Sequence, residues 1–139
     1  MIRKVVKHSV FTLVLVLLVA TFAGCGNQAA QKPIEYTTAD LSTMIKELDD
    51  NQAAASKKYK DQYLKVSGKF TFIDQEGQHI SLQPEDTLIR GVECFLKKGD
   101  NAQEEFVLKL SDGQQVTAYG KIVDMGPLKG YIMNVEKFE

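Results

Sequence analysis

The sequence has few of the residues that build disulfide frameworks, zinc sites and many active sites. Its 139 residues include two cysteines, two histidines and no tryptophan. Two cysteines allow at most one intrachain bridge, which excludes a small fold held together by several disulfides. Zinc sites usually take several ligands from Cys and His, and no such spacing occurs here. The chain must therefore be held together mainly by a hydrophobic core.

Charge is absent from a long stretch near the N-terminus, and the residues on either side of it are typical of an export signal. Residues 9–23 carry no charge and consist mostly of Val, Leu and Phe. The small residues Ala23 and Gly24 then precede Cys25. A basic head precedes the stretch, and it consists of Arg3, Lys4 and Lys7. This order of basic, apolar and small residues predicts a cleaved export signal.

The end of this segment resembles a bacterial lipobox, in which a cysteine receives a thioether-linked diacylglycerol and becomes the new N-terminus. The matching residues are Ala23, Gly24 and Cys25, whereas Phe22 stands where Leu is usual. We therefore expect cleavage between Gly24 and Cys25 and lipidation of Cys25. Two acyl chains anchor a protein firmly, whereas one holds it only marginally. An uncleaved membrane span and an ordinary secretory signal are the alternatives, although a span needs about 20 apolar residues.

Three segments follow from this interpretation. Residues 1–24 are the lipoprotein signal peptide, and residues 25–35 are a flexible tether, because small polar residues cannot bury enough surface to fold. Residues 36–139 are long enough to form one core. Cleavage removes three basic residues and no acidic one, so the formal net charge changes from −1 to −4. This mild acidity argues against a general nucleic-acid binder, which needs Lys and Arg to neutralise phosphates.

The domain is predicted to begin with a helix over about residues 38–57. Its apolar residues recur at spacings of three and four, which is typical of an amphipathic helix. They are Leu41, Met44, Ile45 and Leu48. Thr37 is expected to cap this helix, and Asn51 marks a point where it can bend.

The pattern then changes to the period of two that is typical of strands. Five strands are predicted over residues 63–73, 79–83, 89–96, 115–123 and 131–138, with a helix over 102–110. In the first strand one face is predicted to point inward, and it consists of Leu64, Val66, Phe70 and Phe72. Gly68 and Gly120 occupy similar points in two long strands, where a glycine often marks a bend or bulge.

This order predicts a mainly β (α+β) fold. It is a five-stranded OB-fold barrel with a helix between strands three and four and an extra N-terminal helix. The domain also resembles the tRNA-anticodon-like OB-fold family of bacterial exported proteins and lipoproteins. The residues that carry the resemblance are 36–41, 51–55, 57–60, 64–69, 91–95 and 113–120. The resemblance implies an OB barrel, and it implies no particular reaction or ligand.

The residues offer little support for an enzyme, and neither a metal site nor a cofactor is expected. Asp49 and Asp50 are neighbours on a predicted helix, as are Glu104 and Glu105, so the two members of each pair point in different directions. Cys94 lies in an apolar run and is interpreted as a small buried hydrophobic residue. No base is placed near it to activate the thiol.

OB barrels bind oligonucleotides and sugars on the face of strands two and three and on the adjoining loops. The residues predicted to point outward there are His79, Ser81, Gln83, Gly91, Glu93 and Phe95. The loop before the last strand adds Met125 and Leu128. With Phe95 as the only aromatic and Glu93 opposing phosphate, nucleic acid is an unlikely partner.

The favoured hypothesis is an exported lipoprotein in which an OB-fold module binds a ligand at the membrane surface. Cys25 would hold it to the cell membrane or the outer membrane, with the domain on the extracytoplasmic side. The partner would be an envelope protein, a wall glycan or a small ligand. Binding of single-stranded nucleic acid or oligosaccharide by the barrel is the alternative. For His79 and for the loop over 125–130, a role as ordinary turn residues also remains open.

Overall fold

The computed structural model describes residues 32–87 and 89–139. Within this range, the segment from Ile34 to Glu139 forms one compact unit. The predicted signal peptide, with Gly24 and Cys25, lies outside the described residues. Among the helices that the structure does describe, none combines the length and apolarity needed to cross a bilayer.

The N-terminal part contains a short strand and two helices where the sequence predicted one helix. β1 spans Thr37–Ala39, α2 spans Leu41–Asp50 and α3 spans Gln52–Tyr59. The prediction that Thr37 caps the helix was wrong, because Thr37 pairs with β2 and the cap is Asp40. The Asp40 side chain accepts a hydrogen bond from the Thr43 backbone N–H at 2.7 Å. This bond lowers the pKa of the Asp40 carboxyl below its ordinary value.

Asn51 separates the two helices. Its backbone is extended, with φ −159°, so it cannot continue the helical turn of α2. Its side chain accepts from the Ala54 backbone N–H at 3.1 Å, which makes it the N-cap of α3. The same residue therefore ends one helix and begins the next, and the expected bend is a complete break.

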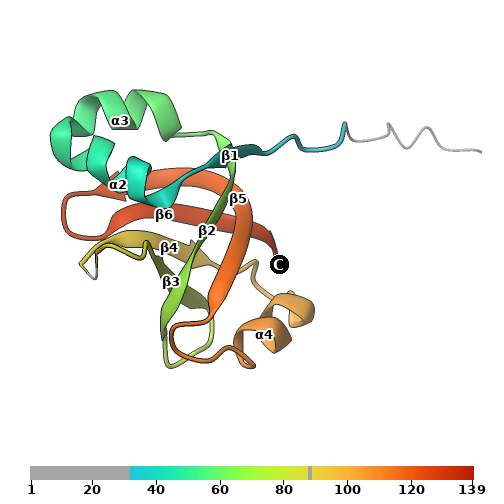
Figure 1. The fold of residues 1–139 in the computed structure, drawn as a ribbon. Helices are drawn as coiled ribbons and strands as arrows, with labels where there is room; N and C mark the ends of the chain where they lie inside the picture. The colour runs from blue at the N-terminus through green and yellow to red at the C-terminus, as the bar shows by residue number, and fades with distance from the viewer. Residues whose placement is uncertain (1–31, 88) are drawn as a thin grey trace, which may run out of the picture. The chain divides into compact units, whose positions relative to one another are not determined.

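The remaining elements form a closed five-stranded barrel, which confirms the predicted OB fold (Figure 1). Their order is β2 Tyr63–Ile73, β3 His79–Gln83, β4 Gly91–Phe95, α4 Asn101–Val107, β5 Gln115–Gly126 and β6 Gly130–Phe138. The strands are arranged β1-β2-β3-β4-β6-β5, and β5 also pairs with β2 to close the barrel. β4 and β6 run parallel, and every other pairing within the barrel is antiparallel. β1 adds a parallel strand beside the first half of β2.

β2 serves two neighbours, as expected of a long strand in a small barrel. Residues 63–69 pair with β5, and residues 69–73 pair with β3. The irregularity in the β2–β3 pairing lies between Phe70 and Phe72, two residues after the glycine where a bend was expected. Gly68 instead lets the backbone of β2 lie close to β3 and to α2. A Cβ there would lie 2.9 Å from the Gln83 carbonyl oxygen and 3.0 Å from Leu41 Cδ2.

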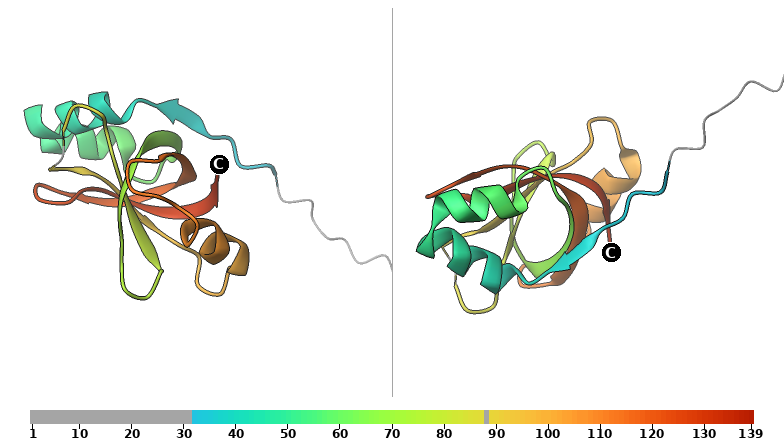
Figure 2. Two further views of the ribbon diagram at one scale, coloured as in Figure 1. Left: turned by 60° about the horizontal axis from the view of Figure 1, so that its bottom comes forward. Right: turned by 90° about the horizontal axis from the view of Figure 1, so that it is seen from above.

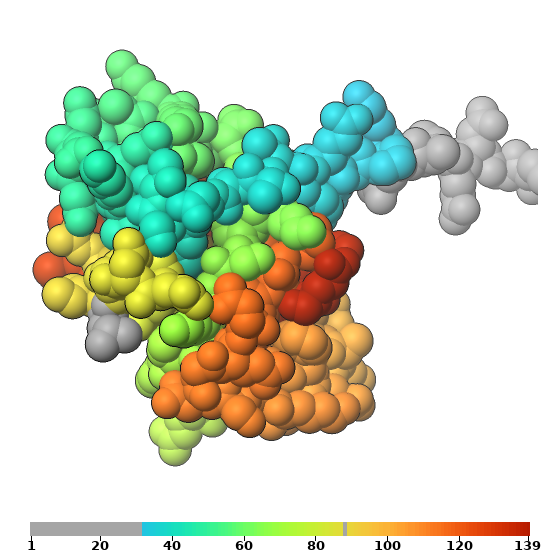
Figure 3. Space-filling view, in the orientation of Figure 1, coloured from blue at the N-terminus to red at the C-terminus, as the bar shows by residue number. Residues whose placement is uncertain are grey.

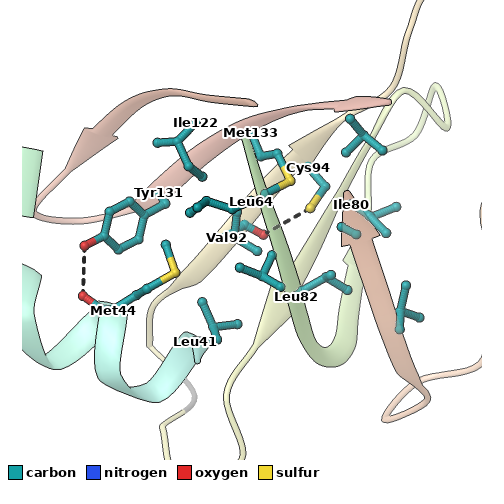
Figure 4. Packing of buried hydrophobic residues seen from close by; sticks show 14 of the residues in the cluster. Leu41, Met44, Leu64, Ile80, Leu82, Val92, Cys94, Ile122, Tyr131 and Met133 are labelled. Carbon is teal, nitrogen blue, oxygen red and sulfur yellow. Dashed lines mark hydrogen bonds between the residues drawn. The ribbon is translucent and has the colours of Figure 1, made fainter. Parts of the chain in front are cut away.

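The hydrophobic core fills the barrel and extends under the N-terminal helices (Figure 4). Tyr131 on β6 is fully buried, and its hydroxyl donates to the Met44 carbonyl oxygen of α2 at 2.9 Å. The edge of its ring also meets the Tyr59 ring of α3, with centroids 5.5 Å apart. Cys94 is fully buried and forms no disulfide among the residues that the structure describes, which confirms its interpretation as a small core residue. Burial raises the pKa of its thiol, so the sulfur is an unreactive packing group.

Helices cover the two ends of the barrel. α2 and α3 lie across one end, and α4 lies at the other (Figures 1 and 2). Figure 3 shows the loop between β3 and β4 (yellow) against α2 (cyan). There Ser42 donates to the Asp86 carboxylate at 3.0 Å, and Arg90 pairs with Asp49. The N-terminal helices are therefore held to the barrel by polar contacts at the rim as well as by the core.

Candidate ligand-binding face

The outer surface of β3 and β4 is hollowed into a shallow cavity of about 230 Å³. β2, β6 and the loop between β5 and β6 complete its walls. We call this surface the aromatic face, and its lining residues are Phe72, His79, Ser81, Glu93, Phe95, Lys129 and Ile132. The β3–β4 register places His79 opposite Phe95 and Ser81 opposite Glu93. Four of the residues predicted from the sequence therefore meet in one place.

The polar centre of the aromatic face is the Glu93 carboxylate. Its Oε2 atom lies 2.5 Å from His79 Nε2 and accepts a hydrogen bond from Ser81 Oγ at 2.6 Å. Both contacts use the same oxygen, so neither of them occupies Oε1. The side chain remains about one-fifth exposed. A ligand can therefore meet a carboxylate oxygen that the protein holds in place but does not saturate.

This arrangement fixes the carboxylate and differs from a serine–histidine–acid triad. In a nucleophile–base–orienter chain, the hydroxyl would donate to the imidazole. Here Ser81 and His79 both contact Glu93, so the serine hydroxyl is bonded to the carboxylate and not to a histidine base. Within the described ranges, no group of three or more His, Cys, Asp or Glu side chains is placed to hold a metal ion. These residues can form hydrogen bonds to a ligand.

Three rings form a continuous shelf beside this carboxylate. The His79 ring stacks on Phe95 with centroids 4.8 Å apart and planes 9° apart. The Phe72 ring lies 5.6 Å from His79 at a tilt of 56°. Phe72 is 50% exposed and Phe95 is 42% exposed, which is unusual for rings in contact. Two half-exposed phenyl rings joined by an imidazole offer a ready surface for stacking.

The inward orientation predicted for Phe72 was wrong. Because the β2–β3 pairing shifts between Phe70 and Phe72, Phe70 is buried and Phe72 turns to the outer surface. The following turn places His79 beside it. The Asp74 side chain accepts from the backbone N–H groups of Gln78 at 2.7 Å and His79 at 3.0 Å. This turn carries the chain from the exposed ring of β2 to the start of β3.

The other sequence-predicted residues do not line the cavity. Gln83 lies farther along β3, where it pairs with β2. Gly91 was predicted to point outward but is buried, since a Cβ there would lie 1.9 Å from the Leu82 carbonyl oxygen. Met125 packs partly against the core, and Leu128 is 85% exposed near the tip of its loop.

Sequence reasoning did not single out three residues of the aromatic face. Phe72 was assigned to the wrong side of β2, Lys129 was included only as part of the loop over 125–130, and Ile132 was not considered. Lys129 comes from the predicted loop, immediately after Leu128, and Ile132 is on β6, opposite Glu93 in the parallel register. Membership of the loop over 125–130 was the only sequence signal for Lys129. Ile132 is brought beside β4 only by the β4–β6 pairing of the barrel.

A family model named tRNA_anti-like matches residues 1–133 of the chain. No curated protein sequence matches this chain. Among solved structures, a proposed nucleic acid-binding lipoprotein of Klebsiella pneumoniae has a TM-score of 0.57 at 18% identity. That match covers 73% of this chain and 92% of the other. An aspartyl-tRNA synthetase of Leishmania major has a TM-score of 0.51 at 9% identity.

The synthetase match covers 79% of this chain but only 21% of the synthetase. An engineered OB-fold binder, OBody AM2EP06 bound to hen egg-white lysozyme, has a TM-score of 0.50 at 14% identity. It covers 58% of this chain and 81% of the binder. At these identities the structures establish a shared OB fold and nothing about ligands.

Proposed function

Because this chain belongs to the tRNA_anti-like family, we propose that it is a membrane-anchored lipoprotein of the cell envelope that binds a ligand on its aromatic face. One observation carries the proposal. His79, Phe95 and the Glu93 carboxylate lie on β3 and β4, the second and third strands of the barrel. The loop between β5 and β6 adjoins them. These are the elements with which OB folds bind their ligands.

The anchor is supported by the sequence of residues 1–25. A basic head, an uncharged apolar run and the small residues before Cys25 form the order of a lipoprotein signal. The Klebsiella protein with the same fold is also described as a lipoprotein. Diacylation at Cys25 would hold the domain outside the cytoplasm, at the cell membrane or the outer membrane, without a spanning helix.

Binding is favoured over catalysis by the way the polar groups are used. Ser81 and His79 hold Glu93 from two sides, and the Ser81 hydroxyl donates to the carboxylate and not to the imidazole. The rings beside them are rigid, half exposed and apolar. Such a surface suits recognition, and a wall glycan or an envelope protein is the kind of ligand that an anchored domain would meet.

Replacing Cys25 by Ser should leave the precursor without lipid. The serine hydroxyl cannot form the thioether, so labelled palmitate should not be incorporated. Cys94→Ala is the matched control, because it removes the only other cysteine and should leave labelling unchanged. Continued palmitate incorporation by the Cys25→Ser protein would contradict the anchor.

A photo-crosslinking amino acid placed at Phe95 should capture the ligand in intact cells. The same reagent at Lys57, an exposed position on α3 that does not line the cavity, is the control. An adduct formed from position 95 and not from position 57 is the expected result, and its mass would separate a protein from a glycan. Identical adducts at both positions, or none at either, would refute binding on this face.

A further inference from the structure

We propose that the ligand of the aromatic face is an uncharged oligosaccharide, with one sugar ring seated against the phenyl and imidazole rings. The inference rests on the proposed function, since it assumes that this face is where the protein binds. It goes further by naming the chemistry of the ligand. Three properties of the face carry it: the size of the cavity, the sign of its charge and the character of its walls.

The cavity holds one ring of a longer molecule. Its volume of about 230 Å³ is below the roughly 300–1,000 Å³ of pockets that enclose drug-sized ligands. It lies on a sheet surface, with Phe72 at one side and Lys129 and Ile132 at the other. A polymer can therefore place one unit in the hollow and continue across the strands.

The charge of the face disfavours a polyanion. The lining contains one acid, Glu93, and one basic residue, Lys129, so their formal charges cancel. Single-stranded nucleic acids are bound in grooves that follow the backbone with several cations. Three other lysines of the barrel strands are paired with acids elsewhere. Lys69 lies 3.7 Å from Glu85, Lys121 lies 2.9 Å from Asp61, and Lys137 lies 2.6 Å from Glu139.

The walls of the face match the two kinds of surface on a sugar ring. The face of a phenyl ring carries negative charge density and attracts polarised C–H groups, which cover one side of a pyranose. The hydroxyl and amide groups of the sugar are hydrogen-bond donors. Glu93 supplies a charged acceptor that Ser81 and His79 hold in place. Hydrogen bonds to a charged acceptor are about twice as strong as neutral ones. The aromatic face should therefore prefer a ligand that combines neutral hydrogen-bond donors with an apolar ring surface.

The test uses ¹⁵N chemical-shift mapping on the domain from Ile34 to Glu139. This domain contains every residue of the described core and every described strand and helix, so it is expected to fold without the N-terminal segment. The probes are chitotetraose, cellotetraose, a ten-nucleotide oligothymidylate and a single-stranded RNA of the same length. We expect one or both saccharides to shift the amides of His79, Glu93 and Phe95. Affinity should be the same in 50 mM and 200 mM NaCl.

The variant Glu93→Gln distinguishes the two polymer classes by the sign of its effect. For a saccharide, loss of the charged acceptor should weaken binding by about tenfold, since charge-assisted bonds are the stronger ones. For a nucleic acid, removal of a negative charge should strengthen binding. Glu105→Gln on α4 is the matched control, because its carboxylate is three-quarters exposed and its nearest cation, Lys109, is 3.9 Å away.

The variant Lys129→Gln supplies the complementary readout. Saccharide binding should stay independent of salt in this variant, because no phosphate is there to be neutralised. Oligonucleotide affinity should fall. The slope of log affinity against log salt should decrease by the amount expected for about one phosphate contact. Lys57→Gln on α3 is the matched control, since this lysine is exposed and lies away from the cavity.

Two outcomes would overturn the inference, and both leave the proposed function to be judged by crosslinking. Salt-dependent oligonucleotide binding on this face, strengthened by Glu93→Gln, would make the ligand a nucleic acid and would support a binding role for the face. The absence of any saccharide-induced shift at His79, Glu93 and Phe95 would also refute the saccharide. Only the lack of a specific adduct from position 95 in cells would then argue against the face itself.

Discussion

Gly130→Ala should destabilise the domain by about 3 kcal/mol or more, one of the two largest effects we expect from a single substitution. Gly130 has φ +82°, a left-handed conformation that costs a non-glycine residue about 1–3 kcal/mol. A Cβ there would also lie 2.2 Å from the Gly91 carbonyl oxygen, where the two backbones meet at the start of the parallel β4–β6 pairing. Backbone atoms on both strands would have to move. Thermal unfolding should show a fall in melting temperature of about 12 °C or more.

Two other glycines separate the cost of the positive φ from the cost of the steric clash. Gly126 pairs with Gly130 across the β5–β6 hairpin, yet it has no positive φ and an added Cβ would meet no atom within 4 Å. Gly126→Ala should therefore be close to neutral. Gly113 has φ +77° with open space around it, so Gly113→Ala should show the conformational cost alone, about 1 kcal/mol. Equal losses at 113 and 130 would show that the β4 backbone moves away at little cost, against our expectation.

This close approach also bears on the aromatic face. Gly130 directly follows Lys129, which reaches the cavity from the β5–β6 loop. Because Gly91 and Gly130 meet without side chains, β4 and β6 come close enough for the loop to border the face. A Gly130→Ala protein that still folds should therefore show altered amide shifts at Lys129. The sequence offered no means of finding this contact, because it joins two glycines 39 residues apart.

Local patterns predicted the elements well, and tertiary contacts decided the exceptions. Alternation of polar and apolar residues located the five barrel strands, since one face of each strand is buried. It failed at Phe72 because one irregular pair in the β2–β3 ladder reverses the inside and outside of the last residues of β2. It also failed at Gly91, where a buried glycine on an outward position looks the same in sequence as an exposed one. The break at Asn51 was visible only as a weak point, because an Asn can end a helix or cap one.

The candidate site was predictable to the same degree and for the same reasons. His79, Ser81, Glu93 and Phe95 lie on two short strands in regular register, so alternation placed all four on one surface. The hydrogen bonds to Glu93 and the stacking of His79 on Phe95 depend on which residues face each other across β3 and β4. In that register Gly91 approaches the Leu82 backbone closely, and this contact has no clear sequence signal. Lys129 and Ile132 required the closed barrel.

Tyr131→Ala should cost about 3–5 kcal/mol, the usual range for truncating a large buried aromatic residue. Tyr131 is fully buried on β6, and it connects the barrel to both N-terminal helices. Its hydroxyl donates to the Met44 carbonyl oxygen, and its ring packs against Tyr59. Burial raises the pKa of its phenol, so the group remains a donor over the pH range in which proteins fold. Denaturant unfolding monitored by circular dichroism would measure the loss.

Tyr131→Phe isolates the hydrogen bond from the packing. It keeps the ring but leaves the Met44 carbonyl oxygen without its buried donor, which should cost about 1–3 kcal/mol. Tyr119→Phe is the matched control, because that hydroxyl donates to the exposed Glu139 carboxylate at 2.6 Å and water can replace it. If both substitutions cost the same small amount, water reaches Met44 and the helices are joined to the barrel by apolar contact alone. A larger loss at Tyr131 would show that α2 and the barrel form one cooperative unit, so that the additional helices are part of the folded core.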